Sequence, residues 1–382
     1  MNEILDNVLK KLNPDQVKDL MFNGKNHPIV VNGKKYLVVD AKDTKVAISE
    51  DYNFIFNKLN GNFMRWGKTY DDDPEFSPIG GEILDIEITT SCSGINGVLC
   101  PFCYKSNTPN GLNMNLDTFK GILDKMGVQL TQVAFGADST GTSNPDLWEM
   151  AKYCREKGIV PNLTIANIND EIADRITSLL GACAVSRYSD KNVCYDSIKK
   201  LTDRGMKQVN MHYMISENTY DQCIETLNDI KTDPRLSKLN AIVLLSLKQK
   251  GRGEKFTQLS KDKYAYLVKF CLDNNISFGM DSCGATKFLD AIKDSPNYDK
   301  LKVVVEPCES TVFSQYIDVN SDFYPCSFCE NISGWEKGIS VINSNNFLKD
   351  IWYNDKIVEF RNKLTSNCNN CHKSRECPIY KI

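Results

Sequence analysis

The sequence predicts an α/β fold in which helices cover a parallel sheet. From residue 82 onward, strand-like apolar runs alternate with segments whose apolar residues recur at helical spacing. Strands that alternate with helices run parallel, because each helix returns the chain to the same edge of the sheet. The expected strands are residues 83–90, 132–135, 162–166, 182–186, 208–214, 241–247 and 276–281.

The helices between these strands have clear apolar faces. Residues 147–154 carry apolar side chains at i, i+3, i+4 and i+7, with Asn144 expected as the cap, Pro145 at the first position and Gly158 at the end. Similar faces lie within residues 119–126, 220–227 and 264–271. Five cysteines fall on such faces, inside a strand or at a helix start, and are expected to be small core residues: Cys154, Cys183, Cys194, Cys223 and Cys271.

Residues 1–80 are expected to form a separate small α+β unit. Two short helices are predicted over residues 3–12 and 14–22. Residues 29–39 read as a hairpin, because Asn32-Gly33 supplies the two positive φ angles of a type I′ turn, and residues 45–48 add a further strand. A turn-rich linker at 71–81 follows. The unit carries no chemical motif, so it either caps the next domain or guides a substrate.

Composition places the protein in a reducing compartment. Its 382 residues are 41% hydrophobic and 25% charged, with a net charge of -3, which gives no support for nucleic-acid binding. No apolar run approaches the roughly 18 residues of a transmembrane helix, so no membrane partner is expected. The acidic, amphipathic start does not resemble a secretory signal. Fifteen cysteines then indicate metal ligation in the cytoplasm and not a disulfide framework.

Three cysteines follow the first expected strand within one loop. Cys92, Cys100 and Cys103 have the spacing C-x7-C-x2-C. The C-x2-C pair directs two thiolates to one metal centre, and the third cysteine completes a three-sulfur face. Three sulfurs with an open fourth position suit an iron–sulfur cluster whose last iron binds a substrate or cofactor. A closed zinc site is the alternative, but it requires a fourth ligand that the loop does not supply.

This loop resembles the cluster loop of the radical S-adenosylmethionine (SAM) enzymes. Their usual form is C-x3-C-x2-C with an aromatic residue before the last cysteine, the position of Phe102, and the first gap is longer here. The resemblance implies a [4Fe-4S] cluster on the three cysteines, with SAM chelated by its fourth iron. An electron from a donor such as flavodoxin or ferredoxin would cleave SAM to methionine and a 5′-deoxyadenosyl radical, which takes a hydrogen atom from the substrate.

The resemblance also implies the domain organisation. Residues 81–290 would form a partial (βα)6 TIM-like barrel between the N-terminal unit at 1–80 and a cysteine-rich twitch/SPASM-like domain at 291–382. Parallel barrels place their chemistry at the C-terminal ends of the strands, which is where the cysteine loop lies.

Family members bind the SAM amino group with a Gly-Gly-Glu-Pro motif after the second strand. The corresponding stretch here is degenerate, with Asp138, Ser139 and Thr140 over Gly-Gly-Glu, followed by the Asn-Pro-Asp-Leu that often accompanies the motif. Asp138 would accept from the ammonium, and Arg187 would pair with the SAM carboxylate. The full set of expected SAM contacts is Gly136, Asp138, Ser139, Thr140, Asn167, Ser186 and Arg187. An ordinary polar βα loop at 136–144 is the alternative.

Three other features have less specific interpretations. His212 lies in the fifth strand, where a histidine is more often a core residue than a site residue. The basic run 248–255 either holds an anionic substrate or nucleic acid or, as short runs usually do, forms a solvated loop. Cys283 ends the last strand and is a substrate-facing thiol, an extra cluster ligand or a buried thiol.

The C-terminal region carries a second cysteine set. Two short strands around a polar turn, between residues 316 and 325, deliver Cys326 after a proline. The set resembles the auxiliary-cluster domains of radical SAM enzymes, the shorter twitch form more than the full SPASM form. The implied ligands of an auxiliary [4Fe-4S] cluster are Cys308, Cys326, Cys368 and Cys371, with Cys377 as a competing fourth ligand and Cys329 a weaker candidate. A structural zinc site is the alternative.

Together these features predict a radical SAM enzyme with one auxiliary cluster. The expected substrate is a peptide or protein side chain, which would be oxidised, cross-linked or epimerised. The alternatives are a twitch-type dehydrogenase or other enzyme acting on a small molecule, and a non-enzymatic zinc-binding module.

Overall fold

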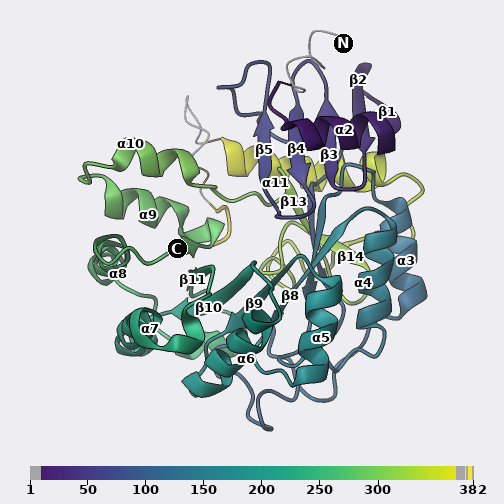
Figure 1. The fold of residues 1–382 in the computed structure, drawn as a ribbon. Coiled ribbons are helices and arrows are strands. Elements are labelled where there is room, and N and C mark those ends of the chain that lie inside the picture. The colour runs from purple at the N-terminus through teal and green to yellow at the C-terminus, as the bar shows by residue number, and fades with distance from the viewer. Residues whose placement is uncertain (1–9, 367–374, 376, 381–382) are drawn as a thin grey trace.

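The structure is a computed structural model that describes residues 10–366, 375 and 377–380. Its N-terminal unit is an antiparallel five-stranded sheet packed on one helix (Figure 1). The elements are α2 (Pro14–Asn23), β1 (Lys25–Val31), β2 (Lys34–Asp40), β3 (Thr44–Ile48), β4 (Asn53–Asn57) and β5 (Phe63–Trp66). The predicted helix at 14–22 is confirmed, and residues 3–9 of the other predicted helix lie outside the described residues.

The predicted hairpin is confirmed, with Asn32 and Gly33 at φ angles of 49° and 78° between β1 and β2. Strands β4 and β5 were not predicted. Their apolar runs are only three and two residues long between polar residues, which is too short for a period to be recognised.

A ten-stranded sheet forms the rest of the molecule, in the order β12-β11-β10-β9-β8-β7-β6-β13-β14-β15. All seven predicted strands are present and parallel. The strands are β6 (Ile83–Glu87), β7 (Gln132–Gly136), β8 (Val160–Ile165), β9 (Ala182–Ser186), β10 (Val209–Ile215), β11 (Ala241–Ser246), β12 (Phe278–Met280), β13 (Ser314–Ile317), β14 (Asp322–Tyr324) and β15 (Ile339–Ser340).

Helices cover the outer face of the parallel strands (Figure 1). They are α3 (Leu116–Lys125), α4 (Leu147–Glu156), α5 (Asp170–Leu179), α6 (Lys191–Asp203), α7 (Tyr220–Thr232) and α8 (Lys261–Asp273). The helices α9 (Ala285–Ile292), α10 (Tyr298–Leu301) and α11 (Asp355–Thr365) follow the strand β12 in the chain. Short 3-10 turns occupy Glu217–Thr219, Pro234–Leu236, Gly251–Lys255, Ser282–Gly284 and Lys302–Val304, and Leu348–Trp352 forms a π-helical turn. No helix of the described chain is long and apolar enough to span a bilayer.

The predicted start of the helix after β7 is wrong by two residues. Helix α4 begins at Leu147, with Asp146 in the cap position. The Asn144 side chain instead donates to Ile88 O (2.7 Å) and Met114 O (2.9 Å), so it ties the loop after β6 to the loop after β7. The five cysteines expected in the core are all buried, which confirms that prediction.

The C-terminal strands continue the central sheet. Strand β13 pairs in parallel with β6, and β14 returns antiparallel to β13, as the predicted pair of strands around a polar turn requires. The segment with the second cysteine set is therefore hydrogen-bonded to the strand that precedes the first set.

The N-terminal unit docks at the amino ends of the parallel strands. Lys45 is buried and donates to Leu130 O (2.7 Å), just before β7. Arg65 pairs with Glu82 (2.6 Å), just before β6, and with Glu309 (3.2 Å). This unit thus lies at the opposite edge of the sheet from the cysteine loop, a position that favours a cap.

Candidate active site

The carboxyl ends of the parallel strands surround a cavity of about 560 Å³. Residues of β6 to β11 and of β13 all contribute to its lining, so the sheet curves around it. A cavity of this size is typical of small-ligand sites. Cys92, Cys100 and Cys103 all line it.

The long gap in the cysteine loop folds into a small hairpin. Ile95 and Val98 exchange two backbone hydrogen bonds (3.0 and 2.9 Å), and Asn96 and Gly97 have φ angles of 51° and 80°. These are the features of a type I′ turn. The Asn-Gly signal that predicted the first hairpin was present here too, but was missed. The hairpin takes up the additional residues of the C-x7-C spacing locally.

The basic loop after β11 holds the cysteine loop in place. Arg252 donates through Nε to Cys100 O (2.8 Å) and through Nη1 to Asn107 O (3.0 Å). Lys250 donates to Phe328 O (3.2 Å) and Glu330 O (2.5 Å), next to the second cysteine set. The interpretation of residues 248–255 as a solvated loop is therefore wrong. Two of its cations, Lys250 and Arg252, donate to backbone carbonyls of the two cysteine segments.

The three cavity thiols offer soft sulfur ligands beside an aromatic wall. Phe102 packs edge-on against Tyr188 and Phe256, with ring centroids 5.5 and 5.7 Å apart. In the described part of the chain, no three His, Cys, Asp or Glu side chains are close enough to hold a single metal ion. A [4Fe-4S] cluster is larger than one ion and separates its sulfur ligands more widely, and thiolates are its usual ligands.

Five of the seven residues expected to contact SAM line the cavity: Gly136, Asp138, Ser139, Ser186 and Arg187. Thr140 and Asn167 are not part of the lining. The Asn167 backbone instead donates to Ser139 O (3.1 Å) and joins the loops after β7 and β8.

Asp138 organises its own loop. Its two oxygens accept from the backbone N–H groups of Thr140, Thr142 and Ser143 (3.0 Å each) and from the Thr140 hydroxyl (2.5 Å). Four hydrogen bonds use the four lone-pair directions of a carboxylate, which leaves none for an ammonium. The side chain therefore shapes the loop whose backbone faces the cavity.

Arg187 is a buried cation with unused donors. Only 4% of its surface is exposed, and its Nε and Nη1 groups have no hydrogen-bond partner in the described structure. Its guanidinium lies 5.9 Å from the ring centroid of Tyr195. A buried charge without a partner is unfavourable, so this position is suited to an anionic group of a ligand.

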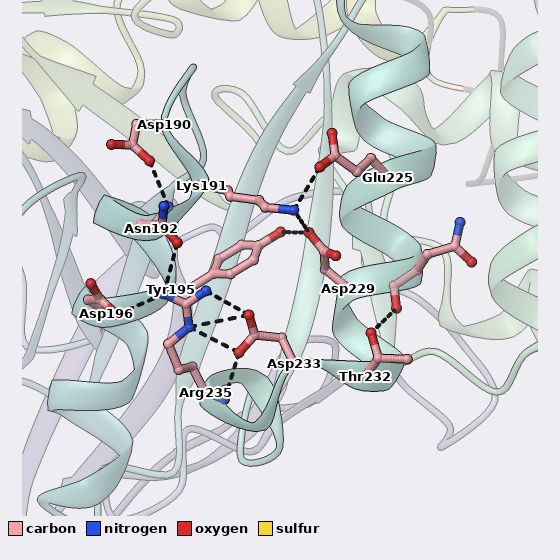
Figure 2. Close-up of polar contacts among 11 residues, drawn as sticks. Asp190, Lys191, Asn192, Tyr195, Asp196, Glu225, Asp229, Thr232, Asp233 and Arg235 are labelled. Atoms are coloured by element: carbon pink, nitrogen blue, oxygen red, sulfur yellow. Dashed lines mark hydrogen bonds and ion pairs between the residues drawn. The ribbon is translucent and has the colours of Figure 1, made fainter.

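Tyr195 is itself held by a surface network between α6 and α7 (Figure 2). Its hydroxyl donates to Asp229 (2.9 Å), which also pairs with Lys191. The Arg235 guanidinium lies 5.1 Å from the Tyr195 ring centroid and pairs with Asp233 and Asp196. The network thus fixes the aromatic ring next to which Arg187 lies.

His212 and Lys248 also face the cavity. Tyr213 is buried on the other face of β10, whereas His212 lines the cavity, where burial lowers its pKa to about 4 and keeps it neutral. Lys248 is ion-paired with Asp281, whose Oδ1 accepts from Ser246 N (3.1 Å). His212 is thus a buried histidine that also lines the cavity, and its part in the site stays a prediction.

The second cysteine set opens onto the same cavity. The cavity lining includes Cys308, Cys326 and Cys377 of this set. It also includes Cys283, which follows β12. Burial raises the pKa of Cys308, and the thiols of Cys283, Cys326 and Cys377 are close enough to contribute. Cys326 Sγ and Cys329 Sγ lie 3.4 Å apart. Cys368 and Cys371 lie outside the described residues.

Known proteins resemble this chain in structure but not in sequence. No family model matches it, and no curated protein sequence does. Streptococcus suis SuiB bound to the precursor peptide SuiA is similar with a TM-score of 0.61 and 13% identity over 84% of this chain and 90% of SuiB. SuiB bound to S-adenosylmethionine gives 0.58 and 12% over 88% and 94%. BtrN in complex with AdoMet and 2-DOIA gives only 0.40 and 12% over 79% and 95%, too low to support an argument. The chain therefore shares the fold of SuiB.

Proposed function

We propose that this protein is a radical SAM enzyme that modifies a peptide or protein side chain. The observation that carries the proposal is the meeting of three loop thiols and a buried arginine with two unused donor groups in one cavity at the carboxyl edge of a parallel sheet. The shared fold with SuiB, whose structures hold S-adenosylmethionine and a precursor peptide, supports the same function.

The residues at the site fit a SAM-binding [4Fe-4S] cluster. Cys92, Cys100 and Cys103 would hold it, and three ligands leave one iron open for SAM. Arg187 would pair with the SAM carboxylate, and backbone carbonyls of the loop after β7 would accept from its ammonium, since Asp138 is fully used. When bound and reduced, the cluster supplies the electron that cleaves SAM.

The aromatic residues have a protective role in this proposal. Phe102 of the cysteine loop packs against both Tyr188 and Phe256. They would keep water from the cavity, which matters for any reaction through a reactive intermediate.

The second cysteine set would hold an auxiliary [4Fe-4S] cluster. The proposed ligands are Cys308, Cys326, Cys368 and Cys371, with Cys377 as a competing fourth ligand, and Cys308, Cys326 and Cys377 line the cavity. A cluster there would exchange an electron with a substrate bound between the two cysteine sets. A flavodoxin or ferredoxin in a reducing cytoplasm would supply electrons. The modification would be an oxidation, a cross-link or an epimerisation.

Reductive SAM cleavage tests this proposal. Anaerobically reconstituted protein with dithionite and SAM should release 5′-deoxyadenosine. Single changes of Cys92, Cys100 or Cys103 to Ala should abolish its release, whereas Cys271→Ala, which removes a buried core thiol, should retain it. A colourless protein that contains only zinc and leaves SAM intact would instead establish the zinc-binding alternative.

A further inference from the structure

Two carboxylates project from β6 toward the cavity. Along this strand, Leu84 and Ile86 are 0% and 1% exposed and pack under the helices, so Asp85 and Glu87 point to the opposite face. Both line the cavity. The Asp85 side chain is open to the cavity, and protein atoms surround that cavity. Glu87 is 4% exposed.

These carboxylates have too little positive charge beside them. Glu87 Oε1 lies 3.1 Å from Lys105 Nζ, but Lys105 also pairs with Glu330 and donates to the Tyr316 hydroxyl (2.9 Å). Glu87 Oε2 has no hydrogen-bond partner among the described residues. The Asp85 side chain has no hydrogen bond or ion pair within the same residues. One ammonium therefore serves two carboxylates, and a third has none.

The neighbouring strand leaves room beside both groups. In the register of β6 and β7, Ala134 lies next to Asp85 and Gly136 next to Glu87. Small residues at both positions leave the two carboxylates facing open cavity. On the other side, Tyr316 of β13 is the neighbour of Asp85, and its hydroxyl is already bonded to Lys105 and Glu330.

The electrostatics show that the protein itself does not compensate this charge. Burial raises the pKa of Asp85 to about 6, with a further contribution from the nearby Glu309 carboxylate. Burial also raises the pKa of Glu87 to about 7, despite Lys105. Above pH 7 both carboxylates are largely ionised while Lys105 supplies one positive charge, and this excess negative charge is unfavourable unless a cation arrives.

We propose that Asp85 and Glu87 bind an ammonium or guanidinium group of the substrate. An organic cation is favoured over a metal ion, because the described residues offer no third ligand beside these two carboxylates. A single ammonium bound here would donate to Asp85 and to the free Glu87 Oε2. The identity of the bound molecule as substrate rests on the proposed function, whereas cation binding itself does not.

Butylammonium chloride and neutral butan-1-ol are a matched pair of probes for this site. In the reconstituted full chain, butylammonium should raise the melting temperature in a concentration-dependent way and butan-1-ol should not. Asp85→Asn should weaken butylammonium binding at least tenfold. This variant should melt no lower than the wild type, because Asp85 has no partner to lose. Glu156→Gln, which removes an exposed carboxylate elsewhere, should bind like the wild type.

SAM also carries an ammonium group and could bind to the same carboxylates. The affinity for SAM is therefore measured for the wild type and for Asp85→Asn. Unchanged SAM affinity in Asp85→Asn assigns the site to the substrate, whereas an equal loss of SAM affinity would overturn that assignment. Equal stabilisation by both probes in the wild type, or full butylammonium binding by Asp85→Asn, would overturn cation recognition. Failure of the proposed function would appear separately, as absence of SAM binding in the wild type.

Discussion

Arg187 is a buried cation with two donor groups that a bound anion could satisfy. Burying a guanidinium without hydrogen-bond acceptors costs free energy, yet two of its nitrogen atoms have none in the described structure. The network of Lys191, Asp229 and Arg235 holds the neighbouring Tyr195 ring (Figure 2). A rigid, unused cation is well suited to bind a carboxylate without further rearrangement.

Arg187→Met should weaken SAM binding by a factor of ten or more. Hydrogen bonds to charged groups contribute about 1.5–3 kcal/mol, and the variant removes the proposed contact with the carboxylate. Calorimetric titration of the reconstituted protein with SAM measures the effect. Arg235→Met, which removes the cation on the surface side of the Tyr195 ring, is the control and should change SAM affinity much less. Equal losses in both variants would contradict direct contact by Arg187.

Cation binding at Asp85 and Glu87 should depend on pH. Both pKa values are raised, to about 6 and about 7, so protons compete with the cation as the pH falls below neutrality. The charged and titratable groups around them are Lys105, Glu330, Glu309, Tyr104 and Tyr316. Butylammonium affinity should fall up to about tenfold between pH 7 and pH 6, as Glu87 takes up a proton, and more steeply below pH 6, where Asp85 is protonated as well. Melting curves with the probe at pH 7.5, 6.5 and 5.5 check this, and a constant affinity would contradict it.

The sequence identified the cysteines and Arg187 but not the two carboxylates. Cysteine spacing is local, so it is visible along the chain. Asp85 and Glu87 alternate with apolar residues in a strand, which shows that they share one face but not what that face meets. Their lack of counter-charge depends on where Lys105, Glu330 and Tyr316 lie, and these contacts link residues more than 200 positions apart.

Among the segments, the basic loop at 248–255 has the clearest structural role. Arg252 donates to two carbonyls of the cysteine loop, and Lys250 donates to two carbonyls of the second cysteine segment. Neither role could be predicted from sequence, because a short basic run has the same composition whether its side chains face water or backbone carbonyls. The loop holds the two cysteine sets in a fixed relation.

Arg252→Ala should impair the first cluster selectively. Without this side chain the carbonyls of Cys100 and Asn107 lose their donors and the cysteine loop loosens. The iron content of the anaerobic protein should fall from roughly eight toward roughly four per chain, because the auxiliary cluster remains. Lys255→Ala, at an exposed position of the same loop, should keep full iron content. Full iron content in Arg252→Ala would show that the hydrogen bonds of Arg252 to the cysteine loop are not needed for cluster binding.

The sequence predicted the positions of the parallel strands, but it did not predict which C-terminal strand pairs with β6. Each of β6 to β12 is an apolar run near a helix with a clear apolar face, and such signals are local. The pairing of β13 with β6 joins residues 314–317 to residues 83–86, and nothing in either run specifies the other. The Ile95–Val98 hairpin, in contrast, could have been predicted from the sequence, because Asn96-Gly97 is the same turn signal as Asn32-Gly33.

Across the entire chain, the two edges of the parallel sheet have different tasks. The N-terminal unit closes the edge where the strands begin, through buried contacts of Tyr52 and Arg65 with Glu82. The cysteine segments meet at the edge where the strands end. Stability and chemistry should therefore be separable by mutation.

Arg65→Met tests this separation. It leaves the buried Glu82 without its cation, and removing one partner of a buried ion pair costs about 3–5 kcal/mol. The free energy of unfolding should fall by about 3 kcal/mol in denaturant titrations, while SAM affinity stays unchanged. Lys34→Met removes an exposed ion pair with Asp51 in the same unit and should have little effect on stability. A parallel loss of SAM affinity in Arg65→Met would contradict the separation.

The central claim is that three cavity cysteines leave one iron open to SAM. Electron paramagnetic resonance of the reduced protein, with and without SAM, tests it most directly when Cys326 is replaced by Ala to remove the proposed auxiliary cluster. The account predicts a [4Fe-4S] signal that changes on addition of SAM and is lost when Cys92, Cys100 or Cys103 is also replaced. A signal that SAM leaves unaltered, or protein that binds no iron at these residues, would contradict it.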